Sequence, residues 1–283
     1  MIELDASSFL LQWAVGGLFF TWVTTRRREV GIGYGWMMRI TYGIMALASI
    51  LVARWLDPVP VRDAAAVGVV LATAFAQYVS VQRKAAGVRG QREVVERRSA
   101  RVAAMTGIDR DEQRFDKETP EFPPALDLIA PAIGVVGLVA AGIDAGSPAW
   151  LSVLRLLVGA AFLGSITDAM LLGHWYLVQP GLARGPLLEL VRWTQWIWPF
   201  EVGVMLIPIG MASVLSGTID DKYGGILGWM WVTCAVTTLG LLIVTRLALR
   251  ERQYSAVMAA TGLLYLAILT AFGTDLVARA VLS

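Results

Sequence analysis

The chain has 283 residues, of which 57% are hydrophobic and only 16% are charged. Soluble domains carry about 25% charged residues, so this composition is typical of a membrane protein. A net charge of +2 gives no support for nucleic-acid binding, and the single cysteine and single histidine are too few for a zinc site or an internal disulfide.

Long apolar segments separated by short polar ones fill the chain from end to end. Most of them reach the roughly 20 residues that a helix needs to cross a bilayer core about 30 Å thick. We therefore predict an all-α integral membrane protein in which residues 1–283 form one domain of about eight transmembrane helices. The expected spans are residues 8–25, 36–56, 63–82, 125–144, 150–178, 186–215, 226–249 and 255–278.

The first span differs from a secretory signal peptide. Glu3 and Asp5 precede it and the basic run Arg26–Arg28 follows it, which is the reverse of the charge order in a cleaved signal. We expect a retained helix with the N-terminus outside.

Basic residues gather in the segments that follow the odd-numbered spans, and such residues mark the cytoplasmic side of a membrane protein. The segments after spans 2, 4 and 6 hold only Arg62 and Lys222 against several acids. This alternation predicts that both termini lie outside the cytoplasm. We expect the protein to lie in a bacterial cytoplasmic (inner) membrane. The basic segments contain Arg26–Arg28, Arg83–Lys117, Arg184, and Arg250 with Arg252.

One connection, residues 83–124, is much longer than the others. Apolar residues recur at helical spacing over residues 91–105, so we expect a cytoplasmic helical arm that continues the third span and ends near Gly107. An extended, proline-containing return over residues 110–124 should follow. The arm is either a solvated segment near anionic lipid headgroups or a docking surface for other membrane or cytoplasmic protein subunits.

Spans 5 and 6 carry ionisable residues within their length, where each costs about 2.5–3.5 kcal/mol unless it faces protein or water. These residues are Arg155, Asp168, His174, Glu189, Arg192 and Glu201. In the other spans the ionisable residues lie near the ends, where we expect their side chains to reach the interface. They are Arg39, Arg54, Asp127, Arg246 and Asp275.

The turn at residues 179–186 is rich in proline and glycine and predicts a tight hairpin between spans 5 and 6. With 1.5 Å of rise per residue, Glu201 becomes the most central carboxylate and Asp168 the next. Pro199 and Pro208 should kink the sixth span and free backbone carbonyls near Glu201. Both carboxylates are therefore candidates for a proton or ion pathway, with structural hydrogen bonding as the alternative.

The sixth span presents two polar stripes. Glu189, Arg192 and Trp196 share one face, and the three-residue spacing predicts a Glu189–Arg192 ion pair. Trp198 and Glu201 share another face. Trp196 and Trp198 lie deeper than an interfacial aromatic belt requires, so aromatic walls beside these polar groups could hold a quinone headgroup.

His174 is the only histidine, which excludes a haem held by two histidines of this subunit. A haem with one histidine ligand, or one shared between subunits, stays open. His174 lies on the same helical side as Gly164, so we expect it to point into the protein. It would there be either a structural residue bonded to Glu189 or a backbone carbonyl, or a proton-handling or quinone-facing group.

Three functions fit these features. The first is a membrane subunit of an energy-converting or respiratory assembly, with a quinone-facing or proton-conducting cluster on spans 5 and 6. The second is a proton-coupled transporter or channel for a small solute. The third is a structural or assembly subunit without a site.

Overall fold

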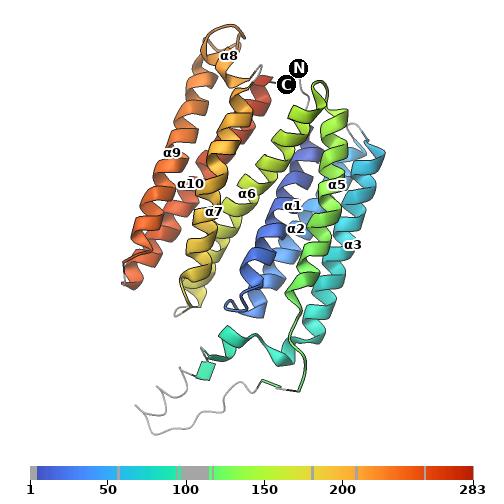
Figure 1. Ribbon diagram of the computed structural model, residues 1–283, viewed down its shortest axis with the longest axis vertical. Coiled ribbons are helices and arrows are strands. Elements are labelled where there is room, and N and C mark those ends of the chain that lie inside the picture. Colours follow the sequence, from blue (N-terminus) through green and yellow to red (C-terminus); the bar gives the residue numbers. More distant parts are fainter. Residues whose placement is uncertain are drawn as a thin grey trace.

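A computed structural model describes residues 5–55, 58–93, 95–96, 115–116, 118–179, 182–207, 210–251 and 253–282. Every regular element within these residues is a helix (Figure 1). The helices are α1 (Ala6–Thr25), α2 (Ile32–Ala53), α3 (Pro60–Gln82), α5 (Ile129–Asp144), α6 (Ala149–Val178), α7 (Gly185–Leu206), α8 (Met211–Leu215), α9 (Ile226–Ala248) and α10 (Tyr254–Leu282), with the 3-10 helices η1 (Lys84–Ala86) and η2 (Pro124–Leu128).

The all-helical prediction is confirmed for the described residues. Seven helical segments there are long and apolar enough to cross a membrane, namely α1, α2, α3, η2 with α5, α6, α9 and α10. The predicted sixth span is the exception. Its helix α7 has 22 residues but carries Glu189, Arg192 and Glu201, and it ends before a break that separates it from α8.

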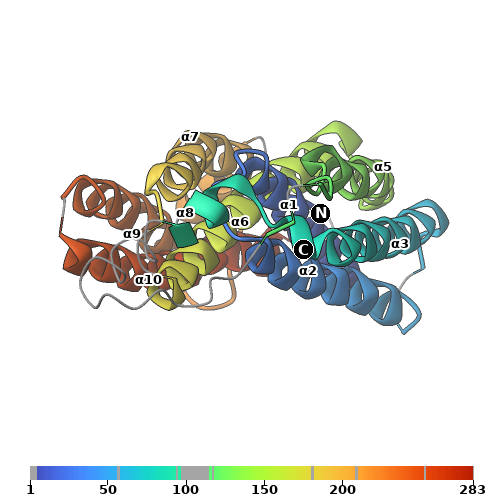
Figure 2. The ribbon, with the colours of Figure 1, turned by 90° about the horizontal axis from the view of Figure 1, so that it is seen from below.

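The long helices run side by side in alternating directions (Figure 1). Both chain ends lie at one end of the bundle, and the connection between α3 and α5 lies at the other. Viewed along the helices, the bundle is an elongated slab with α9 and α10 at one side and α2 and α3 at the other (Figure 2). Helices α1 and α6 pack against each other in its centre, so the charged residues of α6 lie in the middle of the protein.

Apolar side chains cover the outside of the slab as well as its core. On α2, for example, Ile40, Ile44, Leu47 and Leu51 form one exposed stripe at helical spacing. An apolar surface of this kind is typical of helices that contact lipid or other apolar partners.

Glycines allow the central helices to approach closely. A Cβ atom at Gly16 of α1 would overlap the carbonyl of Ala160 in α6, and one at Gly164 of α6 would overlap the backbone of Gly16. Helices α1 and α6 therefore approach each other closely at Gly16 and Gly164. Backbone contact of this kind is typical of helix packing through small residues.

The long connection does not continue α3 as predicted. Helix α3 ends at Gln82, and after η1 the chain turns at Gly87, whose φ of 59° suits glycine. Residues 89–93 and 95–96 are helical, whereas most of the expected helix over residues 91–105 and the end near Gly107 lie outside the described residues.

The described part of the arm is tied to the body of the bundle. The N–H of Gly90 donates to the carbonyl of Arg28 over 2.8 Å, and Glu121 forms ion pairs with Arg28, at 3.2 Å, and with Arg92. The arm therefore begins and ends against the basic segment that follows α1.

A carboxylate organises the start of α9. Asp221 accepts hydrogen bonds from the N–H groups of Tyr223, Gly225 and Leu227 over 2.8–3.0 Å. These bonds, above all that from Gly225, hold the pKa of the Asp221 carboxyl below its ordinary value.

Replacing Gly164 by valine should force α1 and α6 apart and lower the free energy of unfolding by about 1–3 kcal/mol, the usual cost of overpacking. The measurement is unfolding in mixed micelles with increasing dodecyl sulfate. Gly262→Val is the matched control, because a Cβ at Gly262 meets no atom within 4 Å. Equal stability of the two variants would contradict the close approach.

The Asp221 bonds should respond to acid. Because the folded-state pKa is depressed, their stabilising contribution is complete above the ordinary aspartate pKa of about 3.9 and disappears as the pH falls through the depressed value. Amide hydrogen exchange at Gly225 and Leu227 should therefore stay slow down to that range and accelerate below it. In Asp221→Ala these amides should exchange fast at every pH, and persistent protection would refute the capping role.

Candidate functional site

Asp168 lies in the centre of the slab with a fully buried side chain. Its carboxylate accepts hydrogen bonds from the hydroxyls of Tyr42, at 2.6 Å, and Thr21, at 3.3 Å. Asp168 therefore joins α6 to α1 and α2, and its surroundings match the structural alternative for this residue.

Gly17 makes the Asp168 network sterically feasible. A Cβ at Gly17 would overlap the ring of Tyr42, so only glycine lets Tyr42 pass beside α1 to reach α6. No residue pattern within one helix predicts this arrangement, because it requires three helices to meet at one point.

Several ionisable residues expected at the interface are instead buried in pairs. Arg39 donates to Asp127 through two bonds of 2.7 and 2.9 Å, and both side chains are at most 3% exposed. Asp275 is fully buried and accepts from Arg279 over 2.7 Å. The predictions for Arg39, Asp127 and Asp275 were wrong. Arg39 and Asp127 pair across distant segments, which residue spacing within one helix does not reveal. Asp275 pairs with Arg279, which lies one helical turn away. Arg54 is exposed, as expected.

Glu201 has a different environment from these paired groups. Its side chain is fully buried, and no hydrogen-bond donor among the described residues reaches either carboxylate oxygen, whereas the Asp275 carboxyl group lies close enough to share a proton with it. The charged groups that act on it are Asp275, Arg279 and Arg155. Two carboxylates and two guanidinium groups thus form one buried cluster contributed by α6, α7 and α10.

Arg155 connects this cluster to the break after α7. Its Nε and Nη2 atoms donate to the backbone carbonyls of Val204, at 3.0 Å, and Ile207, at 3.4 Å. These carbonyls lose their helical partners where α7 ends before Pro208, as the sequence predicted for a proline in this position. Arg155 is therefore engaged by the backbone and does not neutralise Glu201 by direct contact.

Gln12 of α1 completes the cluster. Its Oε1 accepts from Arg279 over 2.5 Å, while its Nε2 and the Nη1 of Arg279 have no partner in the described part of the protein. These two N–H groups and the two Glu201 oxygens therefore lack a complementary acceptor or donor among the described residues. Buried polar groups generally need one, so the cluster is suited to bind a proton, water or a small ion. We call Gln12, Arg155, Glu201, Asp275 and Arg279 the Glu201 cluster.

His174 lies outside the Glu201 cluster. Its side chain is exposed on α6, and its Nδ1 lies 3.1 Å from the hydroxyl of Tyr265 on α10. The expectation that it points into the protein, towards Glu189 or a backbone carbonyl, was wrong. The side of α6 that carries Gly164 is buried in the middle of the helix, but at His174, near the C-terminal end, it is exposed.

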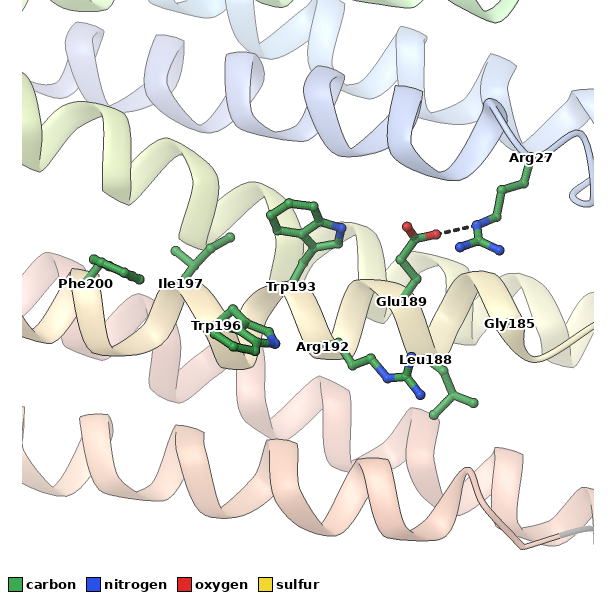
Figure 3. A pocket seen from close by; sticks show the side chains of 9 residues that line it. All are labelled: Arg27, Gly185, Leu188, Glu189, Arg192, Trp193, Trp196, Ile197 and Phe200. Atoms are coloured by element: carbon green, nitrogen blue, oxygen red, sulfur yellow. Dashed lines mark hydrogen bonds and ion pairs between the residues drawn. The ribbon is translucent and has the colours of Figure 1, made fainter.

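Glu189 and Arg192 do not form the predicted pair. Glu189 instead binds Arg26, at 2.6 Å, and Arg27, at 2.5 Å, both in the segment after α1. Glu189, Arg192 and Trp196 do share one face of α7, as expected, and that face is the floor of an open groove of about 640 Å³ (Figure 3). The groove is lined by Arg27, Gly185, Leu188, Glu189, Arg192, Trp193, Trp196, Ile197 and Phe200.

Trp198 points to the other side of α7, where its indole N–H donates to the carbonyl of Ala235 in α9 over 2.9 Å. The eight residues named on spans 5 and 6 therefore fall into separate places. Three line the groove, Arg155 and Glu201 lie in the buried cluster, and Asp168, His174 and Trp198 each have other partners.

The described residues contain no group of three or more His, Cys, Asp or Glu side chains placed to hold a metal ion. Comparison with protein-family models, curated proteins and solved structures finds no match for this chain.

Replacing Tyr42 by phenylalanine should remove the shortest hydrogen bond to a buried carboxylate and cost about 1–3 kcal/mol of unfolding free energy. Tyr265→Phe is the matched control, since it also removes one hydroxyl, but at an exposed site beside His174. Its effect should stay within about 0.5 kcal/mol. Similar losses in both variants would argue against a special role of the Tyr42–Asp168 bond.

Proposed function

We propose that this chain is an integral protein of the bacterial inner membrane that binds and releases a proton at Glu201, as a membrane subunit of an energy-converting assembly. One observation carries the proposal: the Glu201 carboxylate is fully buried, has no hydrogen-bond donor among the described residues, and lies within proton-sharing range of a second carboxylate, Asp275.

Membrane insertion is supported by the seven long apolar helices and by the apolar side chains on the outer surface. The basic segments after α1, α3, α6 and α9 come together at the end of the bundle that bears the arm (Figure 1). On the positive-inside rule, this supports the proposal that this end is cytoplasmic and that both termini lie outside.

The pairing within the Glu201 cluster explains why Glu201 is the proton-binding group. Asp275 is held by Arg279 through two bonds of 2.7 and 3.2 Å, and Arg155 is held by backbone carbonyls. Adjacent carboxylates in a buried site commonly bind one proton between them. A proton on Glu201 would relieve its repulsion from Asp275 without breaking an existing ion pair.

The assembly part of the proposal rests on the arm, whose ends are fixed to the bundle and which would present a surface to other subunits on the cytoplasmic side. The quinone-facing form of this function has less support, because His174 lies apart from the aromatic groove.

A proton-coupled transporter or channel is the second candidate. The observation in its favour is the helix break between α7 and α8, one to two turns from Glu201, where Arg155 binds the carbonyls of Val204 and Ile207. Broken helices beside an ionisable residue are common at transporter binding sites. Native purification with identification of co-purifying subunits and pigments would separate the two functions.

Infrared difference spectroscopy of the protein in liposomes tests the proton site. A carboxyl C=O band should change with pH, and Glu201→Gln should remove the absorbance of one carboxyl group per chain. Asp168→Asn is the control, since Asp168 is equally buried but each of its oxygens accepts a hydrogen bond, and it should leave the Glu201 band unchanged. Identical pH-dependent carboxyl spectra of the original protein and Glu201→Gln would overturn the proposal and leave a structural subunit as the remaining function.

A further inference from the structure

The groove on the outer face of α7 is polar at one end and aromatic at the other (Figure 3). We propose that it binds one anionic phospholipid, with the phosphate held between Arg27 and Arg192 and an acyl chain lying along Trp196 and Phe200. The proposal rests on membrane insertion but is independent of the Glu201 cluster, which lies on the buried face of α7.

The polar end of the groove carries an excess of positive charge. Glu189 is already bound by Arg26 and Arg27, and Glu29 lies 4.0 Å from Arg27. With Arg192, three guanidinium groups face two carboxylates, which leaves one positive charge for a bound anion. The hydrogen bond to Glu189 raises the pKa of Arg27, so its guanidinium stays charged at all physiological pH values.

The other end of the groove offers an apolar surface to a chain. Trp196 is 73% exposed, Phe200 64% and Trp193 41%, and Ile197 lies among them. From Gly185 to Phe200 the helix rises by roughly 22 Å, which is close to the length of a phospholipid acyl chain with its headgroup. The charged end lies at the end of the bundle assigned to the cytoplasmic side, so a lipid of the inner leaflet would enter with its headgroup correctly placed.

The excess positive charge of the groove favours an anionic phospholipid over other amphiphiles as its ligand. Guanidinium groups bind phosphate oxygens strongly and in pairs, and anionic lipids are attracted to basic side chains at the membrane surface by about 1 kcal/mol per residue. A quinone headgroup is neutral and would leave the excess charge unbalanced. A second groove, of about 400 Å³ between α1, α5 and α6, has only apolar lining residues and lacks this feature.

Native mass spectrometry of the detergent-purified chain tests the site, with dioleoyl phosphatidylglycerol and phosphatidylcholine as probes. Phosphatidylglycerol should bind at one molecule per chain, at least tenfold more tightly than phosphatidylcholine. Arg192→Ala should abolish this preference. Arg250→Ala should retain it, because Arg250 is also exposed at the cytoplasmic end but follows α9. Trp196→Ala should weaken both lipids alike.

Equal binding of the two lipids, an unchanged preference in Arg192→Ala, or displacement of phosphatidylglycerol by an equal concentration of ubiquinone would each overturn the lipid site. If the original protein shows no preference for phosphatidylglycerol but keeps the pH-dependent Glu201 infrared band, the lipid site is refuted and the proposed function stands. Release of the chain from membranes by salt alone, without detergent, would instead overturn both proposals.

Discussion

Charge burial is the constraint on which this structure depends. A bundle whose outer surface is apolar must satisfy its internal charges with its own side chains, because an unpaired buried charge costs several kcal/mol. Arg39 with Asp127, Arg62 with Asp5 and Arg279 with Asp275 all follow this rule. Glu201 stands apart among these groups, since its charged neighbours are engaged elsewhere, and for that reason it carries the proposed function.

Close packing of the central helices makes the pairing achievable. The glycine contacts between α1 and α6 bring Gln12 near Asp275 and Arg279, and the space at Gly17 admits Tyr42 to Asp168. Small residues thus do more than reduce the distance between helices. They set the positions at which polar side chains of three helices can meet.

Two faces of helix α7 differ in their side chains, and each carries one of the proposed sites. Unlike the other long helices of the described residues, α7 is not apolar enough to qualify as a membrane span: Glu201 faces the interior, whereas Arg192 and Trp196 face outward along the groove. A site for a proton inside and a site for a lipid outside would then share one helix. Arg155 binds the backbone at the break after Leu206. A change in the protonation of Glu201 on the inner face could reach the lipid groove on the outer face through this break.

The sequence alone determined the all-helical class, the order of the apolar segments and the hairpin between α6 and α7, because these depend on local composition and on the backbone chemistry of proline and glycine. It predicted a kink near Pro208, where the structure has a break between α7 and α8. It also predicted that Glu201 is the most central carboxylate of spans 5 and 6 and that Glu189, Arg192 and Trp196 share one helix face. Only the tertiary structure decided which charges meet and which way each helix faces. Gln12 and Arg279 are 267 residues apart, and the outward turn of His174 follows from the packing of α6 against α1 and α10. Contacts between distant segments are set by how the helices rotate and pack, and a single helix's residue spacing does not encode that rotation.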